Sequence, residues 1–310
     1  MDDHVAFNEK IFYKTMNTKP LLSVICVSMN HEPFIERSFL SLINQTFRDF
    51  EILYIDNNSS DKSFDIADQI FKNSGLAYQH FRREKNYLLS SNLNLLLQQA
   101  TGEYITFLSG DDFMELNHFE EKMNYYLANP QFGMLYGGGY KYYYDTGKTV
   151  LMDNALWKSG WIFKDLLSLN FINSIGVIIK KSTFDDIGVF DENSKLEDWD
   201  MWLRIAQKYP IGLLEKPLVY YGRSTGTNTS ANTPYMDEGV AYIFNKYAQY
   251  KDINKAKRRY MLFRVYEVAS EKPTIKNFKF IVKNCQFNIV YFKQVLKFFL
   301  GLVGFKKQAD

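Results

Sequence analysis

Residues 21–60 read LLSVICVSMNHEPFIERSFLSLINQTFRDFEILYIDNNSS and set the expected architecture. The stretch opens on a continuous apolar run at 21–27 that is rich in β-branched residues, as is typical of a buried parallel strand. An amphipathic helix is expected to open near Pro33, and residues 50–55 form a second apolar run. A strand, a helix and a second strand in this order predict a βαβ unit with a right-handed crossover.

The alternation of strands and helices continues to residue 108. Further elements are expected as helices at 63–72 and 88–99, and as strands at 76–81 and 104–108. The later pattern is mixed, with a hairpin turn at 145–148, strands at 175–179 and 218–221, and a helix at 198–208. The expected fold class is therefore α/β, with a nucleotide-binding type of sheet that is mostly parallel in its first half and mixed in its second.

The domain organisation follows from changes in composition along the chain. The polar, turn-rich segment at 225–234 (TGTNTSANTP) separates the sheet from a basic part with a helical pattern. We expect an N-terminal extension at 1–19, the α/β domain at 20–232, and a helical, aromatic-rich C-terminal region at 233–310.

The composition of the 310 residues excludes several classes of protein. Hydrophobic residues make up 46% and charged residues 23%, which indicates a globular rather than a disordered chain. The two cysteines, Cys26 and Cys285, cannot build a disulfide framework or a thiolate zinc site, which indicates a reducing compartment. The start of the chain lacks a signal-peptide pattern, and no uncharged apolar run reaches the ~18 residues of a membrane span. We therefore expect a cytoplasmic location.

Charge is distributed unevenly, although the net charge is only +2. Residues 251–310 hold 14 Lys and Arg against four Asp and Glu, whereas residues 1–250 are net acidic. One apolar face at helical spacing lies within this basic tail: Phe292, Val295, Leu296, Phe299, Leu302 and Val303. The pattern favours a helix on the anionic inner surface of a membrane; packing on the α/β domain or on a second subunit is the alternative. No nucleic-acid reader motif is present, so no nucleic-acid partner is expected.

Polar and acidic residues follow three of the expected strands at the points where those strands end. The clusters are Ser28 and Asn30, then Asp56, Asn57 and Asn58, and then Asp111 and Asp112. Ligands of open α/β sheets bind beyond the carboxyl ends of the strands, so the clusters are expected to converge on one site. Each cluster alone could reflect only the turn and capping propensities of Asn, Ser and Asp. Their occurrence at successive strand ends favours a binding site.

The adjacent Asp111 and Asp112 give the sharpest chemical signal. Two neighbouring carboxylates repel each other, and a hard cation such as Mg²⁺ or Mn²⁺, bridging to phosphate oxygens, offsets that repulsion. The sequence contains no Walker lysine loop, which disfavours a P-loop ATPase. It also has no GxGxxG after the first strand, which disfavours a dinucleotide dehydrogenase.

Three ordered motifs resemble the family 2 glycosyltransferases with the GT-A fold. The motifs are the stretch at 21–63, then ATGEYI at 100–105 with SGDD at 109–112, and finally GVFD at 188–191, LEDWDMWLR at 196–204 and PLVYY at 217–221. The resemblance covers about residues 20–230. It implies the transfer of a sugar from a nucleotide-sugar, such as a UDP-sugar, to a hydroxyl of a saccharide or a lipid-linked acceptor.

The resemblance also implies residue roles. The implied nucleotide-sugar contacts are Val27, Ser28 and Asn30 beside the base and ribose, Asp56 as acceptor of a hydrogen bond from the base with Asn57 and Asn58 nearby, and Asp111 at the ribose or the metal. Asp112 is implied as the main ligand of Mg²⁺ or Mn²⁺, and Asp198 as the general base. The chain departs from the family pattern at Ser109, where an Asp is usual, and at Thr225, where a His can complete the metal site.

The assignment of Asp198 also has a chemical argument. Inverting transfer needs one carboxylate to take the proton of the acceptor hydroxyl as its oxygen attacks the anomeric carbon. Glu197 and Asp198 open a predicted amphipathic helix, and the dipole of its N-terminus favours an ionised carboxylate. The alternative is that these residues only satisfy the helix terminus.

Two other functions stay open at this point. One is a sugar nucleotidyltransferase, which would need a glycine-rich phosphate loop after the first strand that the sequence lacks. The other is a nucleotide-sugar-binding module without catalysis. The sequence pattern names neither the donor sugar nor the oligomeric state.

Overall fold

The computed structural model describes residues 10–13, 19–224, 233–270 and 274–284. The chain divides into two compact units, and each is described by itself. The first unit comprises residues 1–163 and 170–243, and the second comprises residues 164–169 and 244–310. The apolar helical face expected at 292–303 lies outside the described residues.

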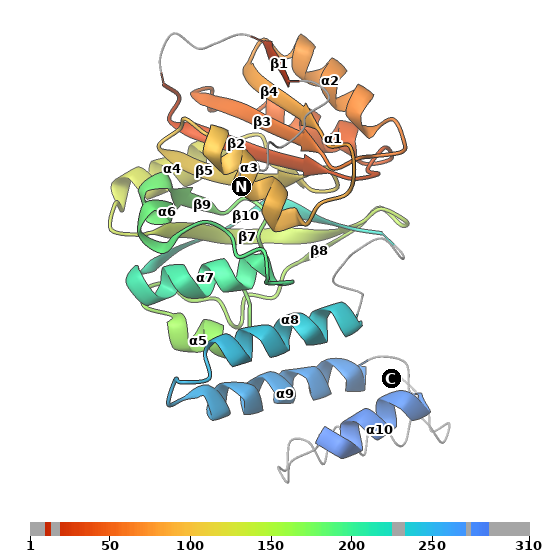
Figure 1. Ribbon diagram of the computed structural model, residues 1–310, viewed down its shortest axis with the longest axis vertical. Helices are drawn as coiled ribbons and strands as arrows, with labels where there is room; N and C mark the ends of the chain where they lie inside the picture. Colours follow the sequence, from red (N-terminus) through yellow and green to blue (C-terminus); the bar gives the residue numbers. More distant parts are fainter. Residues whose placement is uncertain (1–9, 14–18, 225–232, 271–273, 285–310) are drawn as a thin grey trace, which may run out of the picture. The chain divides into compact units, whose positions relative to one another are not determined.

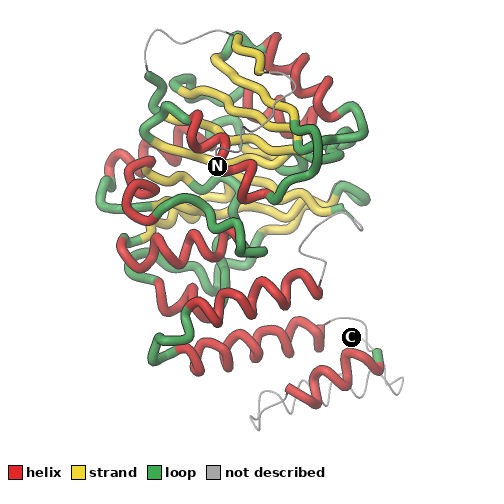
Figure 2. The backbone as a smooth tube through the Cα atoms, viewed as in Figure 1, coloured by secondary structure: helices red, strands yellow, loops and turns green. Residues whose placement is uncertain are grey.

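The first unit is built on one sheet of ten strands (Figure 1). The strands are β1 Lys10–Tyr13, β2 Leu22–Ser28, β3 Phe50–Asp56, β4 Ala77–Arg82, β5 Tyr104–Ser109, β6 Phe113–Met114, β7 Met134–Tyr143, β8 Lys148–Leu151, β9 Ile178–Lys180 and β10 Ile211–Arg223. They lie in the order β1-β4-β3-β2-β5-β9-β7-β10-β6, with β8 paired to β7. Figure 2 shows the strands as a yellow layer with the helices packed around it.

The first half of the sheet is parallel, as the apolar runs predict. Strands β4, β3, β2 and β5 are all parallel neighbours. Strand β2 comes first in the chain among these four strands but lies between β3 and β5, so the strand order reverses beside it. Such a reversal places a crevice beyond the carboxyl ends of the strands, where ligands of open α/β sheets bind.

The second half is mixed, and two of its strands differ from the sequence expectation. Strand β9 is antiparallel to both β5 and β7, whereas β10 is parallel to β7. The run expected at 175–179 begins with a turn, because Gly176 has a φ of +65°, and β9 starts only at Ile178. The strand expected at 218–221 is the end of β10, which is 13 residues long and carries register shifts near Pro217.

The helices of the first unit are α1 Ile35–Ile43, α2 Ser63–Asn73, α3 Leu89–Gln99, α4 His118–Ala128, α6 Lys181–Ile187, α7 Glu197–Lys208 and most of α8 Thr233–Lys246. Alternate residues of the parallel strands point to opposite faces of the sheet. Side chains of α1, α2 and α4 join one apolar cluster with Val24, Ile52 and Tyr54. Helix α3 contributes nothing to that cluster although it contacts β2 and β3, so it covers the opposite face. The sheet is therefore buried on both sides, as parallel sheets usually are.

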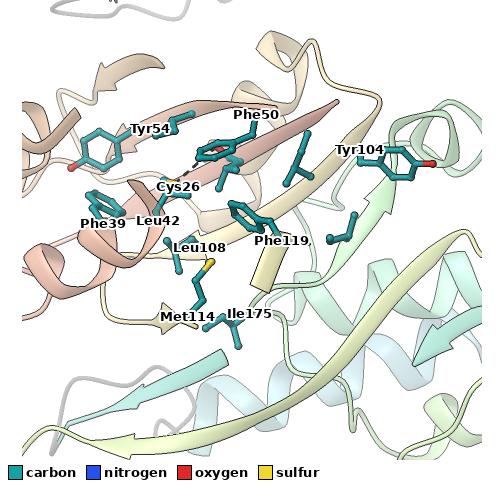
Figure 3. Close-up of a cluster of buried hydrophobic side chains, with 14 of the residues drawn as sticks. Cys26, Phe39, Leu42, Phe50, Tyr54, Tyr104, Leu108, Met114, Phe119 and Ile175 are labelled. Atoms are coloured by element: carbon teal, nitrogen blue, oxygen red, sulfur yellow. Dashed lines mark hydrogen bonds between the residues drawn. The ribbon is translucent and has the colours of Figure 1, made fainter. Parts of the chain in front are cut away.

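Aromatic rings dominate the core of the first unit. Phe39 of α1 lies edge-on to Tyr54 of β3, with ring centroids 5.3 Å apart. Phe50 of β3 meets Phe119 of α4 in the same way at 5.4 Å, and Figure 3 shows these rings with Leu42 and Met114 around them. Each fully buried ring or aliphatic side chain contributes about 1.5–3 kcal/mol through apolar burial. This packing holds the strand ends rigidly enough to carry a site.

The N-terminal segment supplies a strand that the polar composition of 1–19 did not predict. Strand β1 pairs antiparallel with β4, with Phe12 opposite Gln79. It therefore covers the edge of the sheet that β4 would otherwise expose.

The second unit is helical in its described part. It contains most of α5 Phe163–Ser168, the end of α8 Thr233–Lys246, α9 Ile253–Ser270 and α10 Ile275–Asn284. Two ion pairs hold α5. Asp165 of α5 pairs with Arg259 of α9 at 3.6 Å, and Lys164 of α5 pairs with Asp252, the residue before α9, at 3.5 Å. Within the described residues, no helix combines the length and apolarity that crossing a bilayer requires.

Candidate active site

The predicted strand-end clusters lie together at the carboxyl edge of the parallel strands. Ser28, at the end of β2, lies opposite Asp56, at the end of β3, and Val27 lies opposite Ser109, at the end of β5. A backbone hydrogen bond joins the first two strand ends, because the N–H of Asn57 donates to the carbonyl of Ser28 at 2.8 Å. The convergence expected from the strand-end rule is therefore what the structure contains.

Asp56 is the buried centre of the second strand end. Its side chain is fully buried, and its Oδ1 accepts the N–H of Ser59 at 2.9 Å. Its Oδ2 accepts the hydroxyls of Ser59 and of Ser28. The Nε of Arg82 lies 3.8 Å from Oδ1 of Asp56. Both carboxylate oxygens therefore hold the turn together, and a contact from Asp56 to a nucleobase stays a prediction.

The two asparagines with left-handed backbones shape the same edge. Asn30 has a φ of 55° and Asn58 a φ of 62°, a region that Asn tolerates better than most residues. The Oδ1 of Asn30 accepts the N–H of Ser60 at 2.9 Å, which ties the first strand end to the second. The side chains of Asn30 and Asn58 are both exposed. They are thus available to a ligand at the sheet edge.

Asn57 points away from that exposed edge and holds the loop before α3. Its Oδ1 accepts the N–H of Tyr87 at 2.9 Å, and its Nδ2 donates to the carbonyl of Tyr87 at 3.0 Å. The side chain is 7% exposed. Asn57 therefore orders the loop at 83–88, and Val27 contributes through its carbonyl, which accepts the N–H of Gly110 at 3.0 Å.

Asp112 is buried at the end of β5 and is held by a distant strand. Its Oδ1 accepts the N–H of Gly222, in β10, at 2.8 Å. Burial, and next the charge of Asp111, raise the pKa of Asp112 well above its ordinary value, while the Gly222 N–H opposes that shift. Gly222 fits only because it has no side chain: a Cβ there would lie 1.9 Å from the carbonyl oxygen of Asp111.

Asp111 is fixed mainly through its backbone. Its carbonyl accepts the hydroxyl of Tyr144, just past β7, at 2.9 Å, and its Oδ1 accepts the hydroxyl of Ser109. Tyr144 in turn packs on Phe34, with ring centroids 4.3 Å apart. The loop that carries both carboxylates is therefore braced by the ends of β7 and β10.

The fit of this loop to a divalent cation can be judged from its donor set. Asp111 and Asp112 supply two adjacent hard oxygen ligands, and a cation would relieve the charge repulsion that raises the pKa of Asp112. In the part of the chain that the structure describes, no three His, Cys, Asp or Glu side chains come together as a metal site. The two residues fit a cation that takes its remaining ligands from phosphate oxygens and water, as Mg²⁺ sites commonly do.

Asp198 lies in the first turn of α7, which begins at Glu197 as the sequence predicted. Its Oδ1 accepts the N–H of Trp199 at 2.5 Å, and its Oδ2 accepts the Nδ2–H of Asn170 at 3.2 Å. Burial raises the pKa of Asp198, and these two donors oppose the shift. Burial, and next the charge of Asp198, raise the pKa of Glu197 to about 8. The hydrogen-bond donors on Asp198 favour the ionised form of this carboxylate.

Asp198 is connected to the strand-end cluster through an irregular segment rather than directly. Among the described residues, its hydrogen bonds go to Asn170 and Trp199 and not to Asp111 or Asp112. The segment at 170–177 joins β5 where the N–H of Gly176 approaches the carbonyl of Phe107 at 3.4 Å. Phe190, in the loop before α7, also packs edge-on against Phe107 at 5.6 Å.

Three residues of this candidate site were not predicted from the sequence. Gly222 donates to Asp112, Tyr144 braces Asp111, and Asn170 contacts Asp198. Their partners are 110, 33 and 28 positions away in the chain, so no local motif marks them. The glycine between Tyr221 and Arg223, next to an expected strand end, was the one local signal of a close backbone approach.

Sequence comparison connects these features to known enzymes. The family model described as glycosyl transferase family 2 matches residues 23–188. An uncharacterized glycosyltransferase of Haemophilus influenzae is 34% identical over 110 residues, which is 36% of this chain and 44% of that protein. A GalNAc(5)-diNAcBac-PP-undecaprenol beta-1,3-glucosyltransferase of Campylobacter jejuni is 27% identical, over 61% of this chain and 60% of its own length. The chain thus matches less than two thirds of both relatives.

Solved structures show the same fold. The TarS fragment 1–349 of S. aureus, in complex with UDP-GlcNAc, superposes with a TM-score of 0.63 at 18% identity, covering 89% of this chain and 79% of that one. The mannosyltransferase PcManGT of Pyrobaculum calidifontis, in complex with GDP-Man and Mn²⁺, gives a TM-score of 0.63 at 15% identity, covering 93% and 87%. The expected fold, a GT-A type of α/β sheet that is mostly parallel, is confirmed. Because the family model matches more than half of its residues, this chain belongs to glycosyl transferase family 2.

Proposed function

We propose that this chain is an inverting glycosyltransferase that moves a sugar from a nucleotide-sugar donor to a hydroxyl of a saccharide or lipid-linked acceptor. The observation that carries the proposal is a pair of carboxylates with different surroundings, Asp112 buried and Asp198 half-buried. Asp112 lies beside a second carboxylate at the strand-end crevice and accepts the N–H of Gly222, whereas Asp198 lies beside Glu197 and accepts hydrogen bonds from Asn170 and Trp199. The first suits a cation and a diphosphate, and the second suits a general base.

The donor is proposed to bind along the carboxyl edge of β2, β3 and β5. Asn30 and Asn58 are exposed there, and Val27, Ser28, Asp56 and Asn57 form the rigid wall beneath them. Asp111 would face the ribose or the metal. The support for a nucleotide-sugar comes from the fold, which is shared with TarS bound to UDP-GlcNAc and with PcManGT bound to GDP-Man. A UDP-sugar is the proposed donor.

Asp112, assisted by Asp111, is proposed to hold Mg²⁺ or Mn²⁺. When bound, the cation would stabilise the negative charge that builds on the departing diphosphate. The Gly222 N–H keeps Asp112 in place and favours its ionised form, which is the form that binds a cation. The Mn²⁺ in the PcManGT structure supports a metal in this fold.

Asp198 is proposed to act as the base. The acceptor oxygen attacks the anomeric carbon, the bond from that carbon to the diphosphate oxygen breaks, and the bonding electron pair leaves with the diphosphate. Asp198 takes the proton of the acceptor hydroxyl. The hydrogen bonds that Asp198 accepts from Asn170 and Trp199 favour its ionised form, and in that form it can accept the proton without first losing one.

A position at the inner surface of a membrane is part of the proposal for lipid-linked acceptors. Helix α9 carries exposed basic residues in its first two turns: Lys255, Lys257, Arg258 and Arg259. Basic residues near an anionic surface contribute about 1 kcal/mol each at low ionic strength. The name of the Campylobacter relative, which includes an undecaprenol-linked substrate, is consistent with such an acceptor.

Release of nucleoside diphosphate tests the proposal. The purified chain is incubated with UDP- and GDP-sugars and Mn²⁺, and Asp112→Asn and Asp198→Asn are compared with Asp65→Asn, which alters an exposed carboxylate of α2. We expect release by the wild type and by Asp65→Asn, and a loss of at least 100-fold in the two site variants. Donor binding by calorimetry without any release would indicate a binding module instead. Pyrophosphate formation from a nucleoside triphosphate would indicate a nucleotidyltransferase.

A further inference from the structure

The irregular segment at 170–177 is held at both of its ends. It contains two turns of the same kind: the Oδ1 of Asn170 accepts the N–H of Ile172 at 3.2 Å, and the Oδ1 of Asn173 accepts the N–H of Ile175 at 3.1 Å. Ile172 and Ile175 are buried. At its far end, the carbonyl of Gly176 accepts a hydrogen bond from the ammonium of Lys122 in α4. The segment is therefore a fixed part of the structure although it has no helix or strand.

The first of these turns fixes the orientation of the Asn170 amide. Its oxygen accepts a backbone N–H, so its NH₂ group must occupy the opposite position, which faces Asp198. The amide donates to Oδ2 of Asp198, and the N–H of Trp199 donates to Oδ1. Each oxygen of the carboxylate therefore has one donor, and only the donor on Oδ2 comes from a different part of the chain.

We propose that Asn170 is a positioning residue for Asp198: its amide orients the carboxylate and keeps the negative charge on Asp198 rather than on Glu197. The inference rests on the proposed function, in which Asp198 is the base. Two neighbouring carboxyl groups in one helical turn cannot both ionise cheaply when they are buried, so the one with better hydrogen-bond donors ionises first. Asn170 supplies Asp198 with a side-chain donor.

Other charged and titratable groups lie around the pair, and one of them, Tyr235, interacts with Glu197. Tyr235 of α8 lies close enough to Glu197 for the charge of that carboxyl to raise the pKa of the tyrosine. The ammonium of Lys195 lies 5.1 Å from the centroid of the Tyr235 ring and pairs with Glu238. Asp200, on the same helix as Asp198, pairs with Arg204 at 2.8 Å. Among the described residues, Asp198 makes no hydrogen bond or ion pair with any of these groups. The proposal therefore assigns the donor on Oδ2 to Asn170 alone.

The test is the pH dependence of nucleoside diphosphate release by the full chain with a UDP- or GDP-sugar and Mn²⁺. In Asn170→Ala, the proton affinity of Asp198 rises, so the midpoint of the acidic limb of kcat/KM should move up by about one pH unit. Asn170→Asp places a third carboxyl beside the pair and should move it further in the same direction. In both variants, the affinity for the nucleoside diphosphate with Mn²⁺, measured by calorimetry, should stay within about twofold of the wild type.

Asn173→Ala is the matched control, because it removes the second turn of the same segment without a contact to Asp198. It should leave the pH midpoint unchanged. Asn170→Ser is included in case Asn170→Ala does not fold. Its hydroxyl can keep the local turn but cannot reach Asp198 as the amide does. A folded Asn170→Ser variant should therefore show the same upward shift as Asn170→Ala.

Two outcomes would overturn the inference. One is an unchanged pH profile in folded Asn170 variants. The other is an equal shift in Asn173→Ala, which would mean that any loosening of the segment produces the effect. A failure of the proposed function gives a different result, since Asp198→Asn would then retain activity whatever happens at Asn170.

Discussion

Gly222→Ala should disconnect β10 from the Asp111–Asp112 loop. A Cβ at this position would lie 1.9 Å from the carbonyl oxygen of Asp111, roughly 1.4 Å short of the ~3.3 Å at which carbon and oxygen ordinarily touch. The shortest contact is with a backbone atom, and Cε2 of Tyr144 would also lie only 2.8 Å from the Cβ, so the strand or the loop has to move by about an ångström. The hydrogen bond from the N–H at 222 to Asp112, now 2.8 Å long, cannot survive such a shift.

The expected cost has two parts. Overpacking between well-packed backbones costs about 1–3 kcal/mol, and the loss of a hydrogen bond to a charged group costs about 1.5–3 kcal/mol more. A typical domain has 5–15 kcal/mol of stability, so the variant should still fold. Displacement of a catalytic group by about an ångström costs roughly 100-fold in rate. The loss in activity should thus exceed what the loss in stability explains.

Gly138→Ala is the matched control. It lies in β7, opposite Pro217 of the same strand β10, and its Cβ would lie 2.5 Å from the carbonyl oxygen of Glu215. The collision is of the same kind but involves neither Asp111 nor Asp112. Both variants should melt at lower temperature, and only Gly222→Ala should lose about 100-fold in Mn²⁺-dependent nucleoside diphosphate release. Equal activities in the two variants would refute the reasoning.

Two further predictions concern buried charged residues outside the site. Burial lowers the pKa of Lys122 to about 7, so the unfolded chain binds one more proton than the folded chain between about pH 7 and 10.5. Stability should therefore rise with pH in this window by up to ~1.4 kcal/mol per unit, and urea unfolding should show that this slope is absent in Lys122→Met. Glu51 accepts hydrogen bonds from Ser23 and from the N–H and hydroxyl of Thr101 at 2.7–2.8 Å. Glu51→Ala should lower the free energy of unfolding by about 3 kcal/mol or more, and a change below 1 kcal/mol would contradict it.

The parallel half of the fold could be predicted because its signals are local. The apolar runs that became β2, β3 and β5 are continuous, and each is followed by polar residues at the strand end. The second half was harder, because β9 is only three residues long and starts after the Gly176 turn. A short strand between two antiparallel neighbours has no periodicity of its own to read.

The candidate site could likewise be predicted only in part from the sequence. The strand-end rule located Ser28, Asp56 and Asp112 without any knowledge of their partners. It could not separate roles within a cluster, since Asp56 has both of its oxygens occupied inside the protein while Asn30 is exposed beside it. That difference depends on side-chain direction, which the chain's turn propensities do not encode.

The two carboxylate pairs of the site solve one electrostatic problem in different ways. In both pairs, an Asp adjoins a second acidic residue, and a remote element supplies a hydrogen-bond donor: the Gly222 N–H for Asp112, and the Asn170 amide for Asp198. In the pair on α7, burial and next the charge of Asp198 raise the pKa of Glu197 to about 8, so that a proton on Glu197 can offset the second charge. In the pair after β5, a bound proton would prevent metal binding, so in the proposed function a cation offsets the second charge. Chelation of the metal and a fall in pH should therefore inactivate the enzyme independently, the first through Asp112 and the second through both aspartates. An inactive chelated enzyme whose Asp198 midpoint, read by NMR titration, is unchanged would satisfy this expectation; a coupled shift would contradict it.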